Sequence, residues 1–245
     1  MKKVLITFGS QGYEAAKERL RTSASGYFDR VILYGENDID STFYAANSAI
    51  LQQPRGWGYW LWKPYFILKT LEALDDDDLC FYLDATAVFL SSPAVLMELC
   101  IANKGTLLFD NAHFLNYAWT KADCFNLMGL NSREYVYGKQ ADAAIQVYQK
   151  TPWNISFLRE VLSWCTNHHI LTDAPDITGE NHPDFRQHRW DQSVLSLLAI
   201  KHNIPLARSP RRDGNNYGNN GSEKIIELKR DVQKKYHDQR ITSQK

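Results

Sequence analysis

The sequence has no apolar run of about 20 residues, so we expect no transmembrane helix. Its N-terminus is also poor in targeting features. The apolar stretch 4–8 gives way at once to Gly9-Ser10, whereas a signal peptide needs a longer apolar region and a cleavage site. We interpret this stretch as a first strand and expect a cytoplasmic protein.

Cysteine is scarce, and no two cysteines form a C-x-x-C pair. The four are Cys80, Cys100, Cys124 and Cys165. Three of them sit in apolar runs, which favours reduced, buried thiols over a metal site.

An excess of charge of either sign is also missing. Lys+Arg and Asp+Glu number 28 each, so nothing suggests bulk electrostatic binding to nucleic acid, and we expect no such partner. The 245 residues are 44% apolar and 23% charged, which is ordinary for a globular protein and excludes whole-chain disorder. This length suits one domain, or at most two small ones.

What the sequence does have is an alternation of short apolar runs and amphipathic segments. We expect strands over 4–8, 28–34, 79–83, 106–109 and 204–207, and helices over 13–23, 42–52, 64–74, 93–102, 120–128, 153–166 and 190–202. Continuous apolar strands between helices are typical of a mostly parallel sheet covered on both faces. The prediction is an α/β domain over 1–207.

Beyond that domain, residues 208–245 differ in composition. We expect a Gly/Asn-rich loop over 208–221 and a basic helical tail over 222–245, with seven Lys/Arg against four Asp/Glu. Such a tail would allow a weak contact with a membrane surface.

Asp84 ends the most apolar of the expected strands. Ligands of open α/β sheets bind outside the carboxyl ends of strands, and Mg²⁺ or Mn²⁺ takes one or two carboxylates together with phosphate oxygens. The alternative is an aspartate that caps the next turn, and this segment alone does not decide. The preceding run 75–78, four aspartates, is interpreted as a solvated acidic turn.

Six aromatic residues crowd the ten positions 57–66, beside Arg55 and Lys63. Aromatic faces can stack on a nucleobase or a sugar ring, and Lys63 at a helix start could meet a phosphate. The alternative is that these rings simply pack a helix onto the sheet.

Two further segments carry polar groups at element ends. Asp191 stands near the start of the helix over 190–202, with Arg186, His188 and Arg189 just before it. A carboxylate near cations stays ionised and can act as a general base, although it can also merely cap the helix. The strand over 106–109 ends in Asp110-Asn111, which could hydrogen-bond a sugar hydroxyl.

Four segments, in this order, resemble small GT-A-type glycosyltransferases of bacterial capsule and O-antigen gene clusters and of a large algal virus that glycosylates its own capsid. They are Gly-Trp-Gly-Tyr-Trp-Leu-Trp-Lys-Pro (56–64), Phe-Tyr-Leu-Asp-Ala-Thr (81–86), Trp-Thr-Lys-Ala-Asp-Cys-Phe (119–125) and His-Arg-Trp-Asp-Gln-Ser-Val-Leu-Ser-Leu-Leu (188–198). The resemblance covers about residues 2–207 and implies a single GT-A, Rossmann-like domain.

The resemblance implies transfer of a hexosyl or deoxyhexosyl group from a UDP- or GDP-linked sugar to a hydroxyl of a glycan acceptor, with Mn²⁺ or Mg²⁺ as cofactor. The implied donor-binding residues are Thr7, Phe8, Gly9, Ser10, Tyr59, Lys63, Asp84 and Thr86. The implied acceptor-binding residues are Asp110, Asn111, His188 and Trp190, and the implied catalytic residues are Asp191 and Gln192.

The motifs depart from the family in one place. Asp84 matches the first Asp of a D-x-D motif and is the implied metal ligand, but Thr86 stands where many GT-A enzymes have the second Asp. A hydroxyl is a poorer ligand, so metal dependence stays open, or a ligand role shifts to water or to a side chain such as His188. Asp191-Gln192 resembles a D-Q motif whose Asp could be the base of an inverting transfer. Some relatives with this motif retain stereochemistry, so the outcome is open.

Two alternatives remain. One is a nucleotide-sugar or glycan binding module that has lost transfer activity, which Thr86 favours. The other is a haloacid-dehalogenase-type phosphatase, whose D-x-D-x-T pattern the segment 84–88 lacks at its second Asp.

Overall fold

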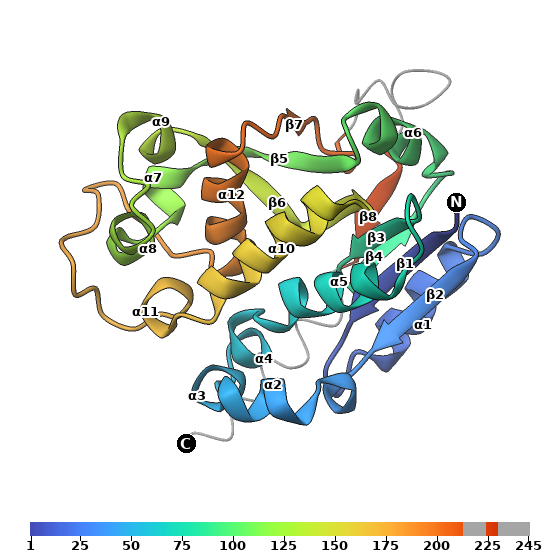
Figure 1. Cartoon of the computed structure of the whole chain (residues 1–245), viewed down its shortest axis with the longest axis horizontal. Coiled ribbons are helices and arrows are strands. Elements are labelled where there is room, and N and C mark those ends of the chain that lie inside the picture. The colour runs from blue at the N-terminus through green and yellow to red at the C-terminus, as the bar shows by residue number, and fades with distance from the viewer. Residues whose placement is uncertain (213–223, 230–245) are drawn as a thin grey trace.

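The computed structural model describes residues 1–212 and 224–229 (Figure 1). Its centre is a six-stranded sheet in the order β2-β1-β3-β6-β5-β7. The strands are β1 (Lys3–Phe8), β2 (Arg30–Tyr34), β3 (Leu79–Leu83), β5 (Thr106–Leu115), β6 (Lys139–Gln149) and β7 (Leu206–Ala207). Strand β6 is antiparallel to both β3 and β5, while the other neighbours pair in parallel. The prediction of a mostly parallel sheet is confirmed.

Strand β6 was not predicted. Polar residues interrupt its sequence, so it has no long apolar run of the kind that indicated the other strands. These polar residues, Gln140, Asp142 and Gln146, are all buried. A central strand with polar side chains is unexpected unless those side chains find partners, and here they do.

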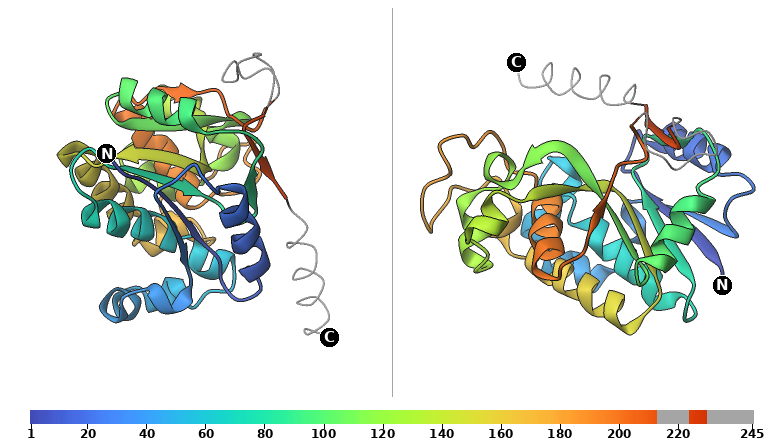
Figure 2. Two further views of the ribbon diagram at one scale, coloured as in Figure 1. Left: turned by 90° about the vertical axis from the view of Figure 1, so that its right-hand side faces the viewer. Right: turned by 90° about the horizontal axis from the view of Figure 1, so that it is seen from above.

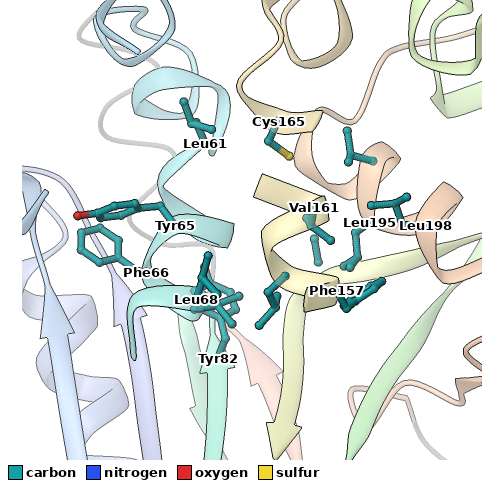
Figure 3. Packing of buried hydrophobic residues seen from close by; sticks show 14 of the residues in the cluster. Leu61, Tyr65, Phe66, Leu68, Tyr82, Phe157, Val161, Cys165, Leu195 and Leu198 are labelled. Carbon is teal, nitrogen blue, oxygen red and sulfur yellow. The ribbon is translucent and has the colours of Figure 1, made fainter. Parts of the chain in front are cut away.

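The two faces of the sheet bury separate cores because side chains alternate along each strand. In β1, Ile6 joins the larger core and Leu5 the smaller one. The larger core lies under α5 (Trp62–Ala73), α10 (Pro152–Cys165) and α12 (Asp191–Lys201), whose apolar side chains point toward one another in Figure 3. The smaller core includes residues of α1 (Glu14–Ser23) and α6 (Ala94–Ala102), so helices cover both faces, as predicted (Figure 2).

The shorter helices depart more from the sequence prediction. The helix expected over 42–52 breaks at Asn47, and the one over 120–128 is shorter. The remaining short helical segments are η1 (Glu36–Asp38), α2 (Ser41–Ala46), α3 (Ser48–Leu51), α4 (Gly56–Tyr59), α7 (Asn116–Trp119), α8 (Ala122–Leu127), α9 (Arg133–Val136) and α11 (His168–Leu171). All four cysteines are free and buried, as predicted.

The helical tail expected over 222–245 is wrong where the structure describes it. Residues 226–228, expected to be helical, form β8 (Ile226–Leu228), which pairs antiparallel with β4 (Ala87–Phe89). Ile225 and Ile226 are 1% and 0% exposed in the smaller core, so their burial explains the strand. The rest of the expected tail and most of the loop over 208–221 lie outside the described residues. Within the described ranges, none of the helices has the length and apolar character needed to cross a membrane.

Candidate active site

Lys63 joins three segments that are far apart in sequence. It lies in the first turn of α5, 4% exposed, and its Nζ is 3.4 Å from Asp84 Oδ1 and 3.2 Å from Asp191 Oδ2. Asp84 directly follows β3, and Asp191 begins α12. The Tyr82 hydroxyl donates to Asp84 Oδ1 at 2.6 Å. We call Lys63, Tyr82, Asp84 and Asp191 the Lys63 cluster.

The electrostatics of the Lys63 cluster favour protonated groups. Burial raises the pKa of Asp191 from 3.8 to about 6, although the Lys63 ammonium opposes this shift. Burial acts to lower the pKa of Lys63, but the facing carboxylates of Asp191 and Asp84 together raise it above its ordinary value. Near neutral pH the site therefore holds a charged lysine and a carboxylate close to its titration point, which suits proton transfer.

A strained turn delivers Lys63 to this position. Five consecutive residues, 56–60, have φ between 51° and 86°, in the left-handed region. This conformation costs about 1–2 kcal/mol for each non-glycine residue. Gly58 is required there, because a Cβ would lie 2.7 Å from the backbone Cα of Leu51. Strain of this kind persists only where the surrounding structure imposes it, and it clusters at functional sites.

The rings of that turn mostly pack inside the protein. Trp60 stacks on Trp190 with 4.5 Å between ring centres, and the Arg55 guanidinium lies 5.0 Å from the Trp190 ring. Trp190 is 7% exposed, and its Nε1 donates to Asp173. Burial raises the pKa of Tyr59. Trp190, predicted to bind acceptor, is thus held by its own packing directly before Asp191.

Gln192 and Asn111 are brought together, whereas Asp110 has another partner. Asn111 Nδ2 donates to Gln192 Oε1 at 3.4 Å, and Gln192 Nε2 donates to Gln140 Oε1 at 2.5 Å. Asp110 instead pairs with the Arg212 guanidinium.

Sequence reasoning missed Asp142 and Arg211. Asp142 on β6 is 2% exposed and accepts a hydrogen bond from the Arg211 guanidinium. Burial raises its pKa against the opposing charge of Arg211, and the negative charge of Asp84 adds to the rise. The polar residues that alternate through 139–149 were the available signal. Because this segment was not predicted to be a strand, they indicated no site.

The end of β1 is closed by its own packing. The Phe8 ring stacks on the Trp62 ring with 4.1 Å between ring centres, and Thr7 is 1% exposed. Gly9 donates its N–H to the Tyr34 carbonyl. Gly9 is buried as well, so the partly exposed Ser10 is the most accessible of the four residues predicted here.

Thr86 is also held by contacts within the protein. It is 8% exposed, and its carbonyl accepts from the Lys229 N–H at 2.7 Å. The segment after Asp84 is thus tied to β8.

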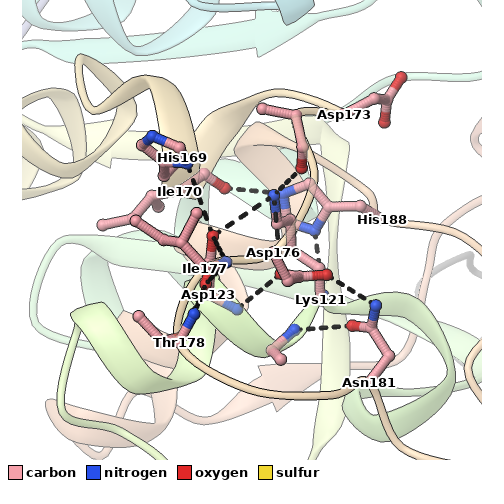
Figure 4. A network of polar contacts seen from close by, with 12 residues as sticks. Lys121, Asp123, His169, Ile170, Asp173, Asp176, Ile177, Thr178, Asn181 and His188 are labelled. Carbon is pink, nitrogen blue, oxygen red and sulfur yellow. Dashed lines mark hydrogen bonds and ion pairs between the residues drawn. The ribbon is translucent and has the colours of Figure 1, made fainter.

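His188 belongs to a different polar network (Figure 4). Its Nδ1 accepts from the Lys121 N–H at 3.3 Å, and its Nε2 lies 2.9 Å from the Ile170 carbonyl. Burial and the nearby Lys121 charge lower the pKa of His188 to about 3, so the ring is neutral. Because both ring nitrogens have partners, we do not carry the predicted acceptor or metal role of His188 forward.

The described residues contain no group of three or more His, Cys, Asp or Glu side chains arranged to hold a metal ion. Asp84, with 31% of its side chain exposed, is the most accessible carboxylate of the Lys63 cluster, and its described side-chain partners all contact Oδ1. This donor set fits an ion held by one protein carboxylate and by phosphate oxygens of a substrate, but not an ion enclosed by protein ligands alone.

No family model matches the chain, and no curated protein matches it. Among solved structures, mouse xyloside xylosyltransferase 1 is similar with a TM-score of 0.49 and 9% identity over 92% of this chain and 97% of that one. The bifunctional glycosyltransferase WbbM is similar with a TM-score of 0.47 and 10% identity over 80% of this chain. The match spans 37% of the WbbM chain. A glycosyltransferase involved in glycosylation of the major capsid of PBCV-1 is similar with a TM-score of 0.42 and 9% identity, over 71% of this chain and 72% of that chain. At these identities we carry no residue role over from these proteins.

Proposed function

We propose that this chain is a glycosyltransferase that moves a sugar from a nucleoside-diphosphate donor to a hydroxyl of a glycan acceptor. The observation that carries the proposal is the Lys63 cluster, in which a buried lysine joins Asp84 at the end of β3 to Asp191 at the start of α12. Three of the motifs on which the sequence resemblance rests contribute these residues. The position, outside the carboxyl end of a strand, is where open α/β sheets bind ligands.

The chemistry needs a group that takes a proton and groups that stabilise a leaving diphosphate. The acceptor oxygen forms a bond to the anomeric carbon of the donor, while the bond from that carbon to the diphosphate oxygen breaks. The leaving oxygen keeps the bonding electron pair, and the acceptor proton passes to Asp191. With a pKa of about 6, Asp191 is mostly ionised near neutral pH and can accept that proton.

Lys63 and a bound ion would offset the negative charge of the leaving group. Lys63 stays protonated because its pKa is raised, and its position lets it offset negative charge as it develops. Mn²⁺ or Mg²⁺, held by Asp84 and by the diphosphate, would neutralise the phosphates further. Hexosyl or deoxyhexosyl donors linked to UDP or GDP are the class we propose.

A thermal-shift titration with nucleoside diphosphates and nucleotide sugars, with and without Mn²⁺, tests this. A ligand at 100 times its Kd stabilises the protein by about 2.7 kcal/mol. We expect a Mn²⁺-dependent shift with one nucleotide and its sugar conjugate, and loss of that shift in Asp84→Asn. Asp76→Asn, the same change at an exposed position of the acidic turn, is the control and should behave as wild type.

Donor turnover then separates the alternatives. A binding module, which Thr86 in place of a second Asp favours, would show a thermal shift with the nucleotide sugar but release no nucleoside diphosphate. A phosphatase would instead hydrolyse simple phosphate esters. A panel that gives no shift with any nucleotide contradicts the proposal itself.

A further inference from the structure

A second group of side chains near α12 lies outside the Lys63 cluster. The rings of Phe114 and Trp119 stack with 4.3 Å between their centres. The Arg189 guanidinium carbon is 4.4 Å from the Trp119 ring centre and 5.3 Å from that of Phe114. The Arg186 guanidinium carbon is 5.9 Å from the Trp119 ring centre. We call these four residues the arginine–aromatic cluster.

Hydrogen bonds tie the arginine–aromatic cluster to the first turn of α12. The Arg189 N–H donates to Ser193 Oγ at 3.2 Å, and the Gln192 N–H donates to the Arg189 carbonyl at 2.9 Å. The Trp119 carbonyl accepts from Ser193 Oγ at 2.9 Å and from Gln140 Nε2 at 3.1 Å. The cluster is therefore positioned by the same turn that presents the proposed base and its neighbouring amide.

The placement of this cluster suits an acceptor rather than a nucleotide. Its aromatic residues come from the far end of β5 and from α7, and Figure 1 places α7 at the opposite end of the molecule from β1 and β2, with α12 between them. Asn111 on the same stretch of β5 contacts Gln192, so the cluster continues the acceptor side of the site.

Arg186 brings a positive charge to this cluster. In the ranges that the structure describes, the exposed Arg186 guanidinium makes no ion pair. Asp184, two residues away, lies 3.9 Å from His182 instead. A second guanidinium, that of Arg189, lies on the same ring.

We propose that the arginine–aromatic cluster binds a carboxylate of the acceptor, so that the acceptor glycan contains a uronic-acid-type sugar. The Trp119 ring beside the Arg186 guanidinium restricts it without using its N–H donors. The donors of Arg186 match the two oxygens of a carboxylate in a fork. The inference rests on the proposed function, because it names the substrate class of the acceptor side of that same site.

The test uses small sugars as probes. Binding of glucuronate, galacturonate and mannuronate is compared with that of glucose, galactose and mannose by saturation-transfer NMR and calorimetry on the full chain. We expect at least one uronate to bind at least tenfold more tightly than its neutral counterpart. Arg186→Gln should remove this preference, and Arg186→Lys should restore only part of it, because an ammonium lacks the fork.

Arg133→Gln is the matched control. The Arg133 guanidinium lies 5.8 Å from the Tyr137 ring, so the change removes an equivalent arginine–aromatic contact elsewhere, and the preference should persist. Equal binding of acidic and neutral sugars, no binding of any uronate, or a preference that survives Arg186→Gln would each overturn the inference.

The nucleotide titration described above is independent of these measurements. A Mn²⁺-dependent nucleotide shift without a uronate preference would remove only this inference. A uronate preference without any nucleotide shift would remove the proposed function and leave the chain as a binder of acidic sugars.

Discussion

In the part of the chain that the structure describes, two buried lysines each lie between two aspartates, and the two sites have opposite characters. Lys63 lies 3.4 and 3.2 Å from Asp84 and Asp191, while Lys121 lies 3.9 and 3.6 Å from Asp123 and Asp176. Their exposed fractions are 4% and 3%. Composition and burial alone therefore do not separate the two sites.

What separates them is how completely their hydrogen bonds are made. Lys121 Nζ also donates to the Ala174 carbonyl at 2.6 Å. Asp123 accepts from the N–H groups of Ile177 and Thr178 and from the Thr178 hydroxyl. Burial acts to raise the pKa of Asp123, yet these donors and Lys121 lower it below its ordinary value. This network holds the loop that precedes α12 to α8, as Figure 4 shows, and its donors favour the ionised form of Asp123.

The Lys63 cluster has fewer such partners. Asp191, although 6% exposed, has a pKa of about 6 because Lys63 does not fully offset its burial. A buried carboxylate that can still change its protonation state near neutral pH is suited to chemistry, whereas one saturated with donors is suited to structure. On this contrast we propose that the Lys63 cluster serves the reaction and that the Lys121 network stabilises the fold.

The largest expected effect separates the two carboxylates by activity. Asp191→Asn should lower the rate of sugar transfer by about 10²–10⁴-fold, because it removes the proton acceptor. Asp123→Asn should destabilise the fold but leave the rate per folded molecule within a few-fold of wild type. Transfer rates with single-turnover kinetics, normalised to the folded fraction by circular dichroism, check both. Equal losses in the two variants would erase the functional contrast.

The next effect concerns stability and the two lysines. Lys121→Met should lower the free energy of unfolding by about 3–5 kcal/mol, because it removes the cation beside the buried Asp123 carboxylate. Lys63→Met should cost less at pH 5 than at pH 8, because Asp191 can then take up a proton. Urea unfolding at both pH values measures this. A loss for Lys63→Met that does not change with pH would contradict the picture of a titratable site.

Much of this arrangement could be predicted from the sequence, and the reasons are local. Asp84 follows a strongly apolar run and Asp191 begins another. Their positions at the ends of the predicted strand and helix were therefore enough to mark them as candidate site residues. Lys63 was indicated by the aromatic run before it. Asp142 was missed because its strand has no apolar run, and Arg211 because it follows a two-residue strand.

His188 shows the opposite limit. Its neighbours in sequence suggested a site, but its ring turns into the Lys121 network. The left-handed turn over 56–60 was equally invisible, since three of its five residues are aromatic and a local pattern predicts no positive φ for them. Both features depend on contacts that are distant in sequence.

The smallest expected effect is a pH dependence that has opposite signs at the two sites. The pKa of Asp191 is raised from 3.8 to about 6 in the folded state, so folding favours its proton, and its contribution to stability falls as the pH rises from about 4 to 6. The pKa of Asp123 is lowered, so its contribution is present above about 4 and is lost as the pH falls. The free energy of unfolding of Asp191→Asn relative to wild type should therefore rise by at most about 3 kcal/mol between pH 4 and 6 and then level off. Lys63 also loses a partner in this variant, but it titrates above that range and adds only a constant offset. Unfolding curves in urea at half-unit pH steps measure the difference, and one that stays flat from pH 4 to 6 would show that Asp191 is as fixed in charge as Asp123.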